Sequence, residues 1–271
     1  MKFLASLIPA FLASTAIAAP SRQERAAARF NRREALRNSN PLQASDLEEL
    51  RLANANESHV SYSSNWAGAV LIGSGYKSVT GTITVPTPKK PSSGSSSTQY
   101  AASAWVGIDG DTCASAILQT GVDFYVQGST VSFDAWYEWY PDYAYDFSGI
   151  PIKAGDQIKM TVTATSTSAG SAVIQNLSTG KTVTKTFSGE SNKYRLCQTN
   201  AEWIVEDFSS GNSLVPFANF GTVTFTGSSV TTSSGTTGVS GSEILDIKQS
   251  GTVLTSCSTS GSSTVTCSYT G

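Results

Sequence analysis

The sequence predicts an all-β fold, and three observations support this. Beyond residue 60, Ser, Thr, Gly and Val dominate and long helix-forming stretches are absent. Charged residues make up only 14% of the chain. Short alternating or apolar runs recur between turn residues, which is typical of a β-sandwich or barrel. A chain of 271 residues can form one such domain.

The N-terminal part has a different composition. Residues 1–18 combine a charged start, an apolar run and small residues before a cleavage point, which predicts a secretory signal peptide too short to span a bilayer. Residues 19–58 are rich in Arg among Ala, Leu and Glu, which indicates a basic pro-segment of helical character. We therefore expect a secreted protein whose β-sandwich domain covers residues 59–271.

The charges are divided unequally between these parts. Eight of the 18 Lys and Arg residues and six of the 20 Asp and Glu residues precede His59, which leaves 10 basic and 14 acidic residues in the body. Opposite charges favour docking of the pro-segment at neutral pH, and acid weakens that docking by protonating carboxylates. We expect the pro-segment to be an inhibitor. A nucleic-acid or membrane arm is the alternative, but an acidic body gives it little support, so we expect neither partner.

Several features bear on processing. Secretion favours two disulfides among the four cysteines, and of the three possible pairings we favour Cys113 with Cys197 and Cys257 with Cys267. Residues 87–99, TPKKPSSGSSSTQ, predict an exposed linker, and a cut there would turn a monomer into two chains. The N-glycosylation pattern occurs at Asn56 and Asn176.

The strand pattern covers most of the body. We expect the first two strands, 65–72 and 78–85, to be neighbours in one sheet, and the Ser/Thr/Gly-rich residues 226–241 to form a loop. The other expected strands cover residues 104–108, 116–124, 131–140, 157–164, 171–176, 182–187, 201–208, 220–225, 243–248, 252–256 and 263–269.

The run 116–124 contains a polar residue, Gln119, among apolar ones. Side chains alternate along a strand, so Gln119 and Asp123 share one face with Ile117, while Leu118 and Val122 occupy the other. An amide and a carboxylate therefore lie on the same side. A solvent-exposed polar face of a sandwich strand is the simpler interpretation.

The residue types exclude several kinds of chemistry. His59 is the only histidine, so a serine or cysteine triad and a histidine-rich zinc site cannot be assembled if the cysteines are paired. No phosphate-binding or dinucleotide-binding glycine pattern is visible, and the Asp-Thr-Gly motif of aspartic peptidases is absent. We expect no metal and no cofactor, and carboxylate chemistry remains.

Two carboxylates lie on aromatic-rich strands. Glu138 and Glu202 are the best pair for a glycosidase. Alternation places Glu202 on the face opposite Trp203, and apolar neighbours would raise the pKa of its carboxyl group. The Tyr-rich residues 141–149 that follow the strand 131–140 indicate a flap or binding rim. Within that strand, Trp136 and Trp139 point to opposite faces.

Five motifs in order resemble the fungal glutamic peptidases, also called eqolisins, across residues 60–270. They are SNWAGA at 64–69, WVGIDG at 105–110, LQTGVD at 118–123, YEWYP at 137–141 and AEWIVEDF at 201–208. The resemblance implies a secreted, pepstatin-insensitive acid endopeptidase, made with a signal peptide and a pro-segment. It implies a sandwich of two antiparallel sheets with a concanavalin A-like, lectin-like architecture, and polypeptide substrates.

The resemblance also implies the site residues. Gln119 and Glu202 match the catalytic pair of the family. The aromatic turn that begins at Tyr137 is similar to a mobile loop over the substrate. The residues expected to bind substrate or to support the pair are Trp105, Asp109, Asp123, Tyr137, Glu138 and Trp139.

The pair suits peptide hydrolysis. Glu202 as carboxylate would take a proton from a water molecule, and the Gln119 amide would donate to the oxyanion. The reverse order, with Glu202 acting first as an acid, stays open. A β-sandwich glycosidase and a non-catalytic glycan-binding module are the alternatives, and only the peptidase requires Gln119.

Overall fold

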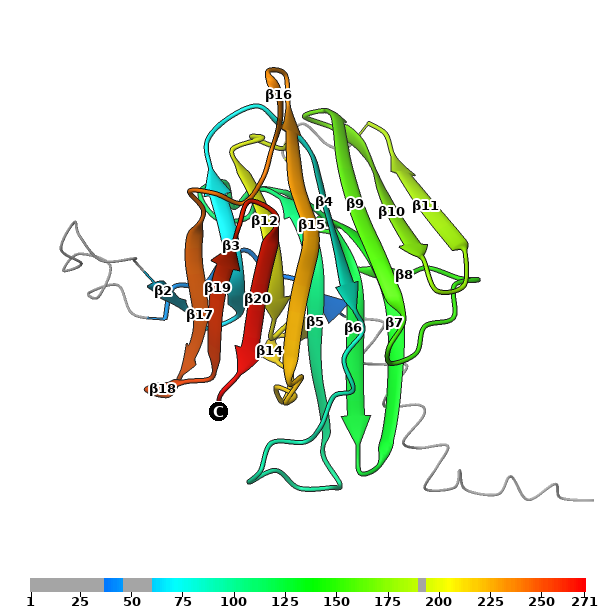
Figure 1. The fold of residues 1–271 in the computed structure, drawn as a ribbon, viewed down its shortest axis with the longest axis vertical. Coiled ribbons are helices and arrows are strands. Elements are labelled where there is room, and N and C mark those ends of the chain that lie inside the picture. The colour runs from blue at the N-terminus through cyan, green and yellow to red at the C-terminus, as the bar shows by residue number, and fades with distance from the viewer. Residues whose placement is uncertain (1–36, 46–59, 190–193) are drawn as a thin grey trace, which may run out of the picture.

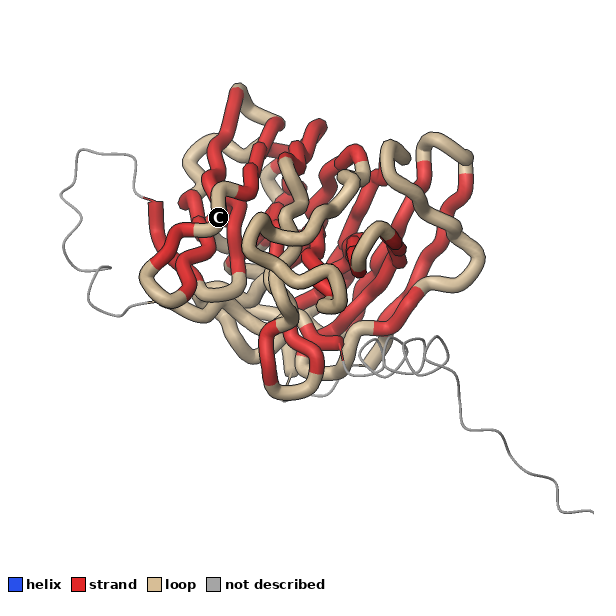
Figure 2. Tube along the Cα trace, turned by 90° about the horizontal axis from the view of Figure 1, so that it is seen from below, coloured by secondary structure: helices blue, strands red, loops and turns tan. Residues whose placement is uncertain are grey.

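The computed structural model describes residues 37–45, 60–189 and 194–271, and the fold is a sandwich of two large β-sheets (Figure 1). The described residues contain strands and loops but no helix (Figure 2), and so no helix that could cross a membrane. The predicted signal peptide and most of the predicted pro-segment lie outside these ranges. The prediction of an all-β sandwich is confirmed.

One sheet has eight strands, and all of its pairings are antiparallel. Its path is β11 (Lys181–Phe187), β10 (Ala169–Asn176), β9 (Gln157–Ser166), β4 (Tyr76–Thr84), β15 (Thr222–Thr232), β20 (Thr264–Tyr269) and β19 (Thr255–Ser260), with β16 (Gly235–Thr237) paired to β15.

The other large sheet has nine strands and carries the candidate site. Its path is β18 (Thr252–Val253), β17 (Glu243–Gln249), β3 (Trp66–Ile72), β12 (Asn200–Glu206), β5 (Gln99–Ile108), β6 (Ile117–Gln127), β7 (Thr130–Tyr140) and β8 (Tyr145–Asp146), with β2 (Val60–Ser63) added parallel to β17. A small third sheet joins β1 (Arg37–Asn38), β13 (Ser209–Ser210) and β14 (Ser213–Leu214).

Alternating apolar side chains of both large sheets fill the space between them. From the nine-stranded sheet, Leu118 and Trp203 point into this core. The Trp203 indole reaches the opposite sheet, where its Nε1 donates to the Thr80 carbonyl at 2.8 Å. Gly81 makes room for it, because a Cβ there would lie 2.9 Å from the indole. Trp203 therefore fixes β12 against the second sheet, one residue from Glu202.

The strand predictions failed in two places. The strands β3 and β4 are not neighbours but belong to different sheets, because the turn through Gly73 and Gly75 carries the chain across the sandwich. The expected loop 226–241 is also wrong in part. Strand β15 continues to Thr232 and pairs with β16, since Ser and Thr tolerate an extended, half-exposed surface as well as a loop.

The cysteine pairing is as predicted. Cys113 bonds to Cys197 and Cys257 bonds to Cys267, at sequence separations of 84 and 10. In the expected linker 87–99, Lys89 exchanges backbone hydrogen bonds with Asn219, and Ser92, Ser93 and Ser95–97 are exposed.

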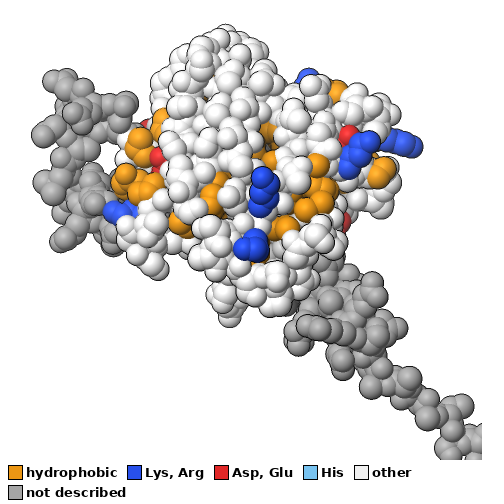
Figure 3. All heavy atoms as spheres, turned by 60° about the horizontal axis from the view of Figure 1, so that its bottom comes forward, with side chains coloured by type: hydrophobic (Ala, Val, Ile, Leu, Met, Phe, Trp, Pro, Cys, Tyr) orange, Lys and Arg blue, Asp and Glu red, His pale blue; other side chains and the backbone are white. Residues whose placement is uncertain are grey.

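Glycosylation of Asn176 does not fit the fold. Its side chain is buried, and its Nδ2 donates to Asp156 Oδ2 at 2.9 Å and to the Pro151 carbonyl at 3.2 Å, so no amide nitrogen is free for a glycan. Asn56 lies outside the described residues. The face shown in Figure 3 carries scattered Lys and Arg side chains on a mostly uncharged surface.

Candidate active site

Four residues form one row across the nine-stranded sheet. Glu202 on β12 lies opposite Gly107 on β5, which lies opposite Gln119 on β6, which lies opposite Glu138 on β7. Directly opposed residues of antiparallel strands present their side chains on the same face. All three polar side chains are fully buried and point away from the core between the sheets. The expectation of a solvent-exposed polar face is therefore wrong.

Gly107 keeps the space between the two predicted catalytic groups open. A Cβ at this position would lie 2.7 Å from Glu202 Oε1 and 2.7 Å from the Trp105 ring, both too close for a real contact. Sequence reasoning did not single out Gly107. The available signal was a glycine inside an apolar strand, which often marks the close approach of another group.

Two further rows lie beside the first on the same face. One holds Trp105 and Trp136 on either side of Gly121, and the other includes Glu206, Ser103 and Asp123. Trp105 links the rows, because its Nε1 donates to Glu206 Oε2 at 2.8 Å. The structure thus brings Trp105 and Asp123 to the face of the predicted pair.

Asp109 lies at the end of β5 and holds the chain that leads into β12. Its carboxylate accepts the backbone N–H groups of four consecutive residues, Cys197 to Asn200, at 2.7 to 3.2 Å. The Cys113–Cys197 disulfide joins the same two segments. Asp109 is therefore placed to position the strand that carries Glu202 rather than to touch a substrate.

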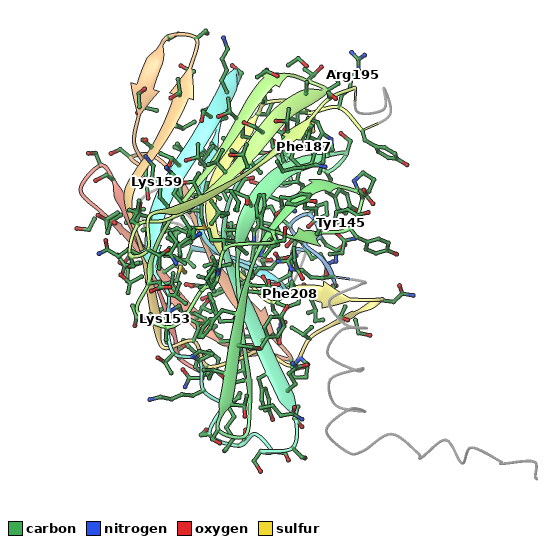
Figure 4. All side chains as sticks on the ribbon, turned by 90° about the vertical axis from the view of Figure 1, so that its right-hand side faces the viewer. Tyr145, Lys153, Lys159, Phe187, Arg195 and Phe208 are labelled. Carbon is green, nitrogen blue, oxygen red and sulfur yellow. A yellow bond between two sulfur atoms is a disulfide. The ribbon has the colours of Figure 1, made fainter. Side chains whose placement is uncertain are left out.

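Tyr137 and Trp139 do not reach this face. They alternate with Glu138 along β7 and so lie on its other side, where Tyr137 packs against Phe147 and Phe187 at ring distances of 4.7 and 6.0 Å. Trp139 Nε1 donates to the Tyr194 carbonyl. Figure 4 labels Phe187 and Tyr145, which line a recess of about 240 Å³ with Tyr137 and Lys185.

An arginine of the predicted pro-segment is buried in the site. The Arg37 guanidinium forms an ion pair with Asp123, with Nη2 2.9 Å from Oδ1. Its Nη1 lies 3.5 Å from Glu138 Oε2. The guanidinium also lies 3.7 Å from the Trp136 ring and 4.7 Å from the Phe208 ring, labelled in Figure 4. Sequence reasoning did not distinguish Arg37 from the other arginines of this segment.

The backbone of Ser39 contacts the first row directly. Gln119 Nε2 donates to the Ser39 carbonyl at 3.2 Å, and the Ser39 N–H donates to Glu138 Oε2 at 3.2 Å. Neither Glu202 oxygen has a hydrogen-bond partner among the described residues. Residues 37–45, which belong to the predicted pro-segment and are blue in Figure 1, therefore lie over the row that contains the predicted pair.

Burial dominates the electrostatics of the site. It raises the pKa of Glu202 well above the ordinary value, and the charges of Asp109 and Asp111 raise that pKa further. Burial also raises the pKa of Glu138, against the opposing effect of Arg37. The pKa of Glu206 is raised to about 7. The described residues contain no group of three or more His, Cys, Asp or Glu side chains that could hold a metal.

The chain is similar in sequence to proteins of one family. Residues 64–269 match the model of the Peptidase A4 family. The chain is 54% identical over 285 residues to Aspergillopepsin-2 of Aspergillus niger, which covers 99% of this chain and 100% of that protein. It is 45% identical over 278 residues to Scytalidopepsin B of Scytalidium lignicola, with 99% and 100% covered.

A solved structure leads to the same assignment. The crystal structure of scytalido-glutamic peptidase with a peptide-based transition-state analogue has a TM-score of 0.68 and 49% identity, and the match covers 76% of this chain and 98% of that one. These relatives favour a peptidase over the glycosidase and glycan-binding alternatives. The chain belongs to the Peptidase A4 family, the eqolisins or glutamic peptidases, and is a peptide-bond hydrolase.

Proposed function

We propose that this chain is a secreted, pepstatin-insensitive acid endopeptidase in which Gln119 and Glu202 are the catalytic pair. The observation that carries the proposal is the shared row of the two side chains on either side of Gly107, with a peptide carbonyl, that of Ser39, bound to the Gln119 amide. A general acid–base group and an oxyanion donor on either side of a peptide bond are what peptide hydrolysis needs.

The reaction starts with a water molecule between Glu202 and the scissile carbonyl. Glu202 takes a proton from this water as it attacks, and the Gln119 amide donates to the oxyanion that forms. Glu202 then gives the proton to the leaving nitrogen. Because Gln119 is neutral, it does not compete with Glu202 for a proton as a second carboxylate would.

The protonation of Glu202 depends on whether residues 37–45 cover the row of side chains that contains it. Burial is the main cause of its raised pKa, and residues 37–45 cover the same row of side chains. Removing this segment admits water, which stabilises the carboxylate and lowers the pKa of Glu202 towards the acid range. The zymogen therefore holds Glu202 protonated, and the open enzyme can ionise it.

A cleavage assay in acid tests the proposed activity. We expect the processed protein to digest a denatured protein substrate at about pH 2 to 4 with pepstatin present, because no pair of aspartates is used. Peptides are identified by mass spectrometry, and pepsin serves as the control that pepstatin stops. Failure of a correctly processed, folded protein to cleave, or full inhibition by pepstatin, would contradict the proposal.

The pro-segment inhibits by occupying the cleft, and Arg37 is its main anchor. The Arg37 pocket includes Asp123, Glu138 and Glu206, whose ionised forms attract the guanidinium. Burial raises the pKa of Glu138 and of Glu206, so acid protonates these two groups and weakens the attraction. This makes release of the segment depend on pH, as the charge difference between pro-segment and body predicts.

Replacing Arg37 should reduce the latency of the zymogen. Breaking a buried ion pair costs about 3–5 kcal/mol, so Arg37→Ala should raise the fraction of uncovered enzyme by about 10²-fold or more near neutral pH. The measurement is the pH at which purified zymogen begins to cleave a fluorogenic peptide, which should rise in Arg37→Ala. Arg37→Lys keeps the charge but loses the two-pronged contact, so the pH at which it begins to cleave should lie between those of the wild type and Arg37→Ala. An unchanged activation profile in Arg37→Ala would show that the anchor lies elsewhere.

A further inference from the structure

The pro-segment is held on both sides of one particular peptide bond. On the N-terminal side, Arg37 and Asn38 pair antiparallel with Ser210 and Ser209 of β13. The Arg37 carbonyl accepts the Ala144 N–H at 3.1 Å. Backbone pairing of this kind fixes an extended chain in a defined register, as it does for peptides added to a sheet edge.

The C-terminal side is held by a different set of donors and acceptors. The Asn40 carbonyl accepts hydrogen bonds from Trp66 Nε1 at 3.0 Å and from Asn65 Nδ2 at 3.3 Å. Asn65 Nδ2 lies 3.2 Å from the Pro41 carbonyl, and the Leu42 N–H donates to the Gly110 carbonyl at 3.0 Å. The chain is therefore anchored directly after Ser39 as well as before it.

Only one carbonyl of the described pro-segment meets the proposed oxyanion donor. Gln119 Nε2 contacts the Ser39 carbonyl, whereas the carbonyls of Arg37, Asn40 and Pro41 accept from other groups. The Ser39 N–H is held by Glu138 at the same time. The hydrogen bonds before, at and after Ser39 therefore all hold the segment in the same register.

We propose that residues 37–42 are bound in the register of a substrate, and that the Ser39–Asn40 bond is the first bond the enzyme cuts in its own chain. This inference rests on the proposed function, since it assigns Gln119 and Glu202 to the cut. The pro-segment is then an inhibitor that becomes the first substrate when acid is added.

The step consumes one water molecule and no other reactant. The water oxygen bonds to the Ser39 carbonyl carbon and the bond from that carbon to the Asn40 nitrogen breaks. Glu202, which is protonated while the segment covers it, gives its proton to this nitrogen and takes one from the attacking water. The products are a Ser39 carboxyl terminus and an Asn40 amino terminus. The N-terminal product is held mainly by Arg37, and protonation of Glu138, whose pKa burial raises, weakens that hold.

The new chain ends can be read directly. Purified full-length zymogen is acidified, samples are stopped over time, and intact mass and N-terminal sequencing identify each cut. We expect Asn40 to be the first new amino terminus. Asn40→Pro places an imide at the bond and should prevent this cut. Asn40→Ala is the matched control, because it loses the same side-chain hydrogen bond to Ser209 but keeps an ordinary amide and should be cut like the wild type.

An external fluorogenic peptide, added to each acidified sample, separates the two proposals. If the external peptide is hydrolysed but the first new terminus lies elsewhere, and Asn40→Pro is processed in the same order as Asn40→Ala, the proposed register is wrong and the peptidase stands. If neither the external peptide nor the chain itself is cut, the proposed function fails as well.

Discussion

Glu202→Gln is expected to fold and to lose at least about 10³-fold in kcat/KM, because it removes the group that we propose moves protons between water and the leaving nitrogen. The substitution keeps the size of the side chain and the open space over Gly107. Substrate binding should change little, so the loss should appear in kcat. Steady-state hydrolysis of a fluorogenic peptide by the processed variant measures it.

Two further variants test whether the loss is specific to Glu202 and its row. Asp246→Asn also removes a buried carboxylate, but Asp246 on β17 accepts a hydrogen bond from Thr255 on β19 and lies outside the row of Gln119 and Glu202. The activity of this variant should therefore stay within a few-fold of wild type. Gln119→Ala should lose about 10²- to 10³-fold, the usual effect of removing one oxyanion donor. A folded Glu202→Gln with near-normal kcat would remove Glu202 from the mechanism.

Local patterns were sufficient for much of the fold. Alternation along 116–124 separated Leu118 from Gln119 correctly, and the same rule placed Glu202 and Trp203 on opposite faces of β12. Both disulfides followed from four cysteines and a short loop. These features depend on a few consecutive residues or on a small number of alternatives, so a sequence determines them well.

The row of side chains could not be predicted in this way. It exists because β12, about 90 residues after β5, inserts between β3 and β5 in the one register that sets Glu202 opposite Gly107. A shift by one residue would turn Glu202 into the core, and no local pattern excludes it. The same lack of long-range information led to the wrong neighbour for β3 and left Gly107 unnoticed.

Arg37 could not be identified from the sequence for a different reason. The excess of arginine in the pro-segment predicted attraction to the acidic body, but any of several arginines could have supplied it. Arg37 is selected by the shape of its pocket, since Trp136 and Phe208 flank the guanidinium while Asp123 accepts two of its N–H groups. Planar stacking combined with a two-pronged ion pair requires the folded site.

The fold should lose stability as the pH rises from about 4 to 7. Burial raises the pKa of Glu206 to about 7 and the pKa values of Asp111 and Asp246 to about 6, from ordinary values of 4.5 for Glu and 3.8 for Asp. The pKa values of Glu138 and Asp207 are also raised well above normal, mainly by burial. In this range the folded chain binds more protons than the unfolded chain.

The sign of the effect follows from that difference in bound protons. A carboxyl group with a raised pKa in the fold contributes its full stabilisation below its unfolded pKa, and this is lost as the pH rises through the folded pKa. For Glu206 the change from 4.5 to about 7 corresponds to about 3 kcal/mol by pH 7. Several such groups together should cost the folded state a large part of a typical stability of about 5–15 kcal/mol.

Denaturant unfolding followed by tryptophan fluorescence, at pH steps from 4 to 7, measures the effect. The Gln119→Ala background slows self-digestion and leaves every carboxylate in place. Adding Glu206→Gln should flatten the pH dependence by about 3 kcal/mol between pH 4 and 7, because the amide keeps an acceptor for Trp105 Nε1 but cannot ionise. Equal stability at pH 4 and pH 7 in the Gln119→Ala protein would mean that these buried carboxyl groups do not retain their protons in the fold. Equal pH dependence with and without Glu206→Gln would assign the loss to other groups.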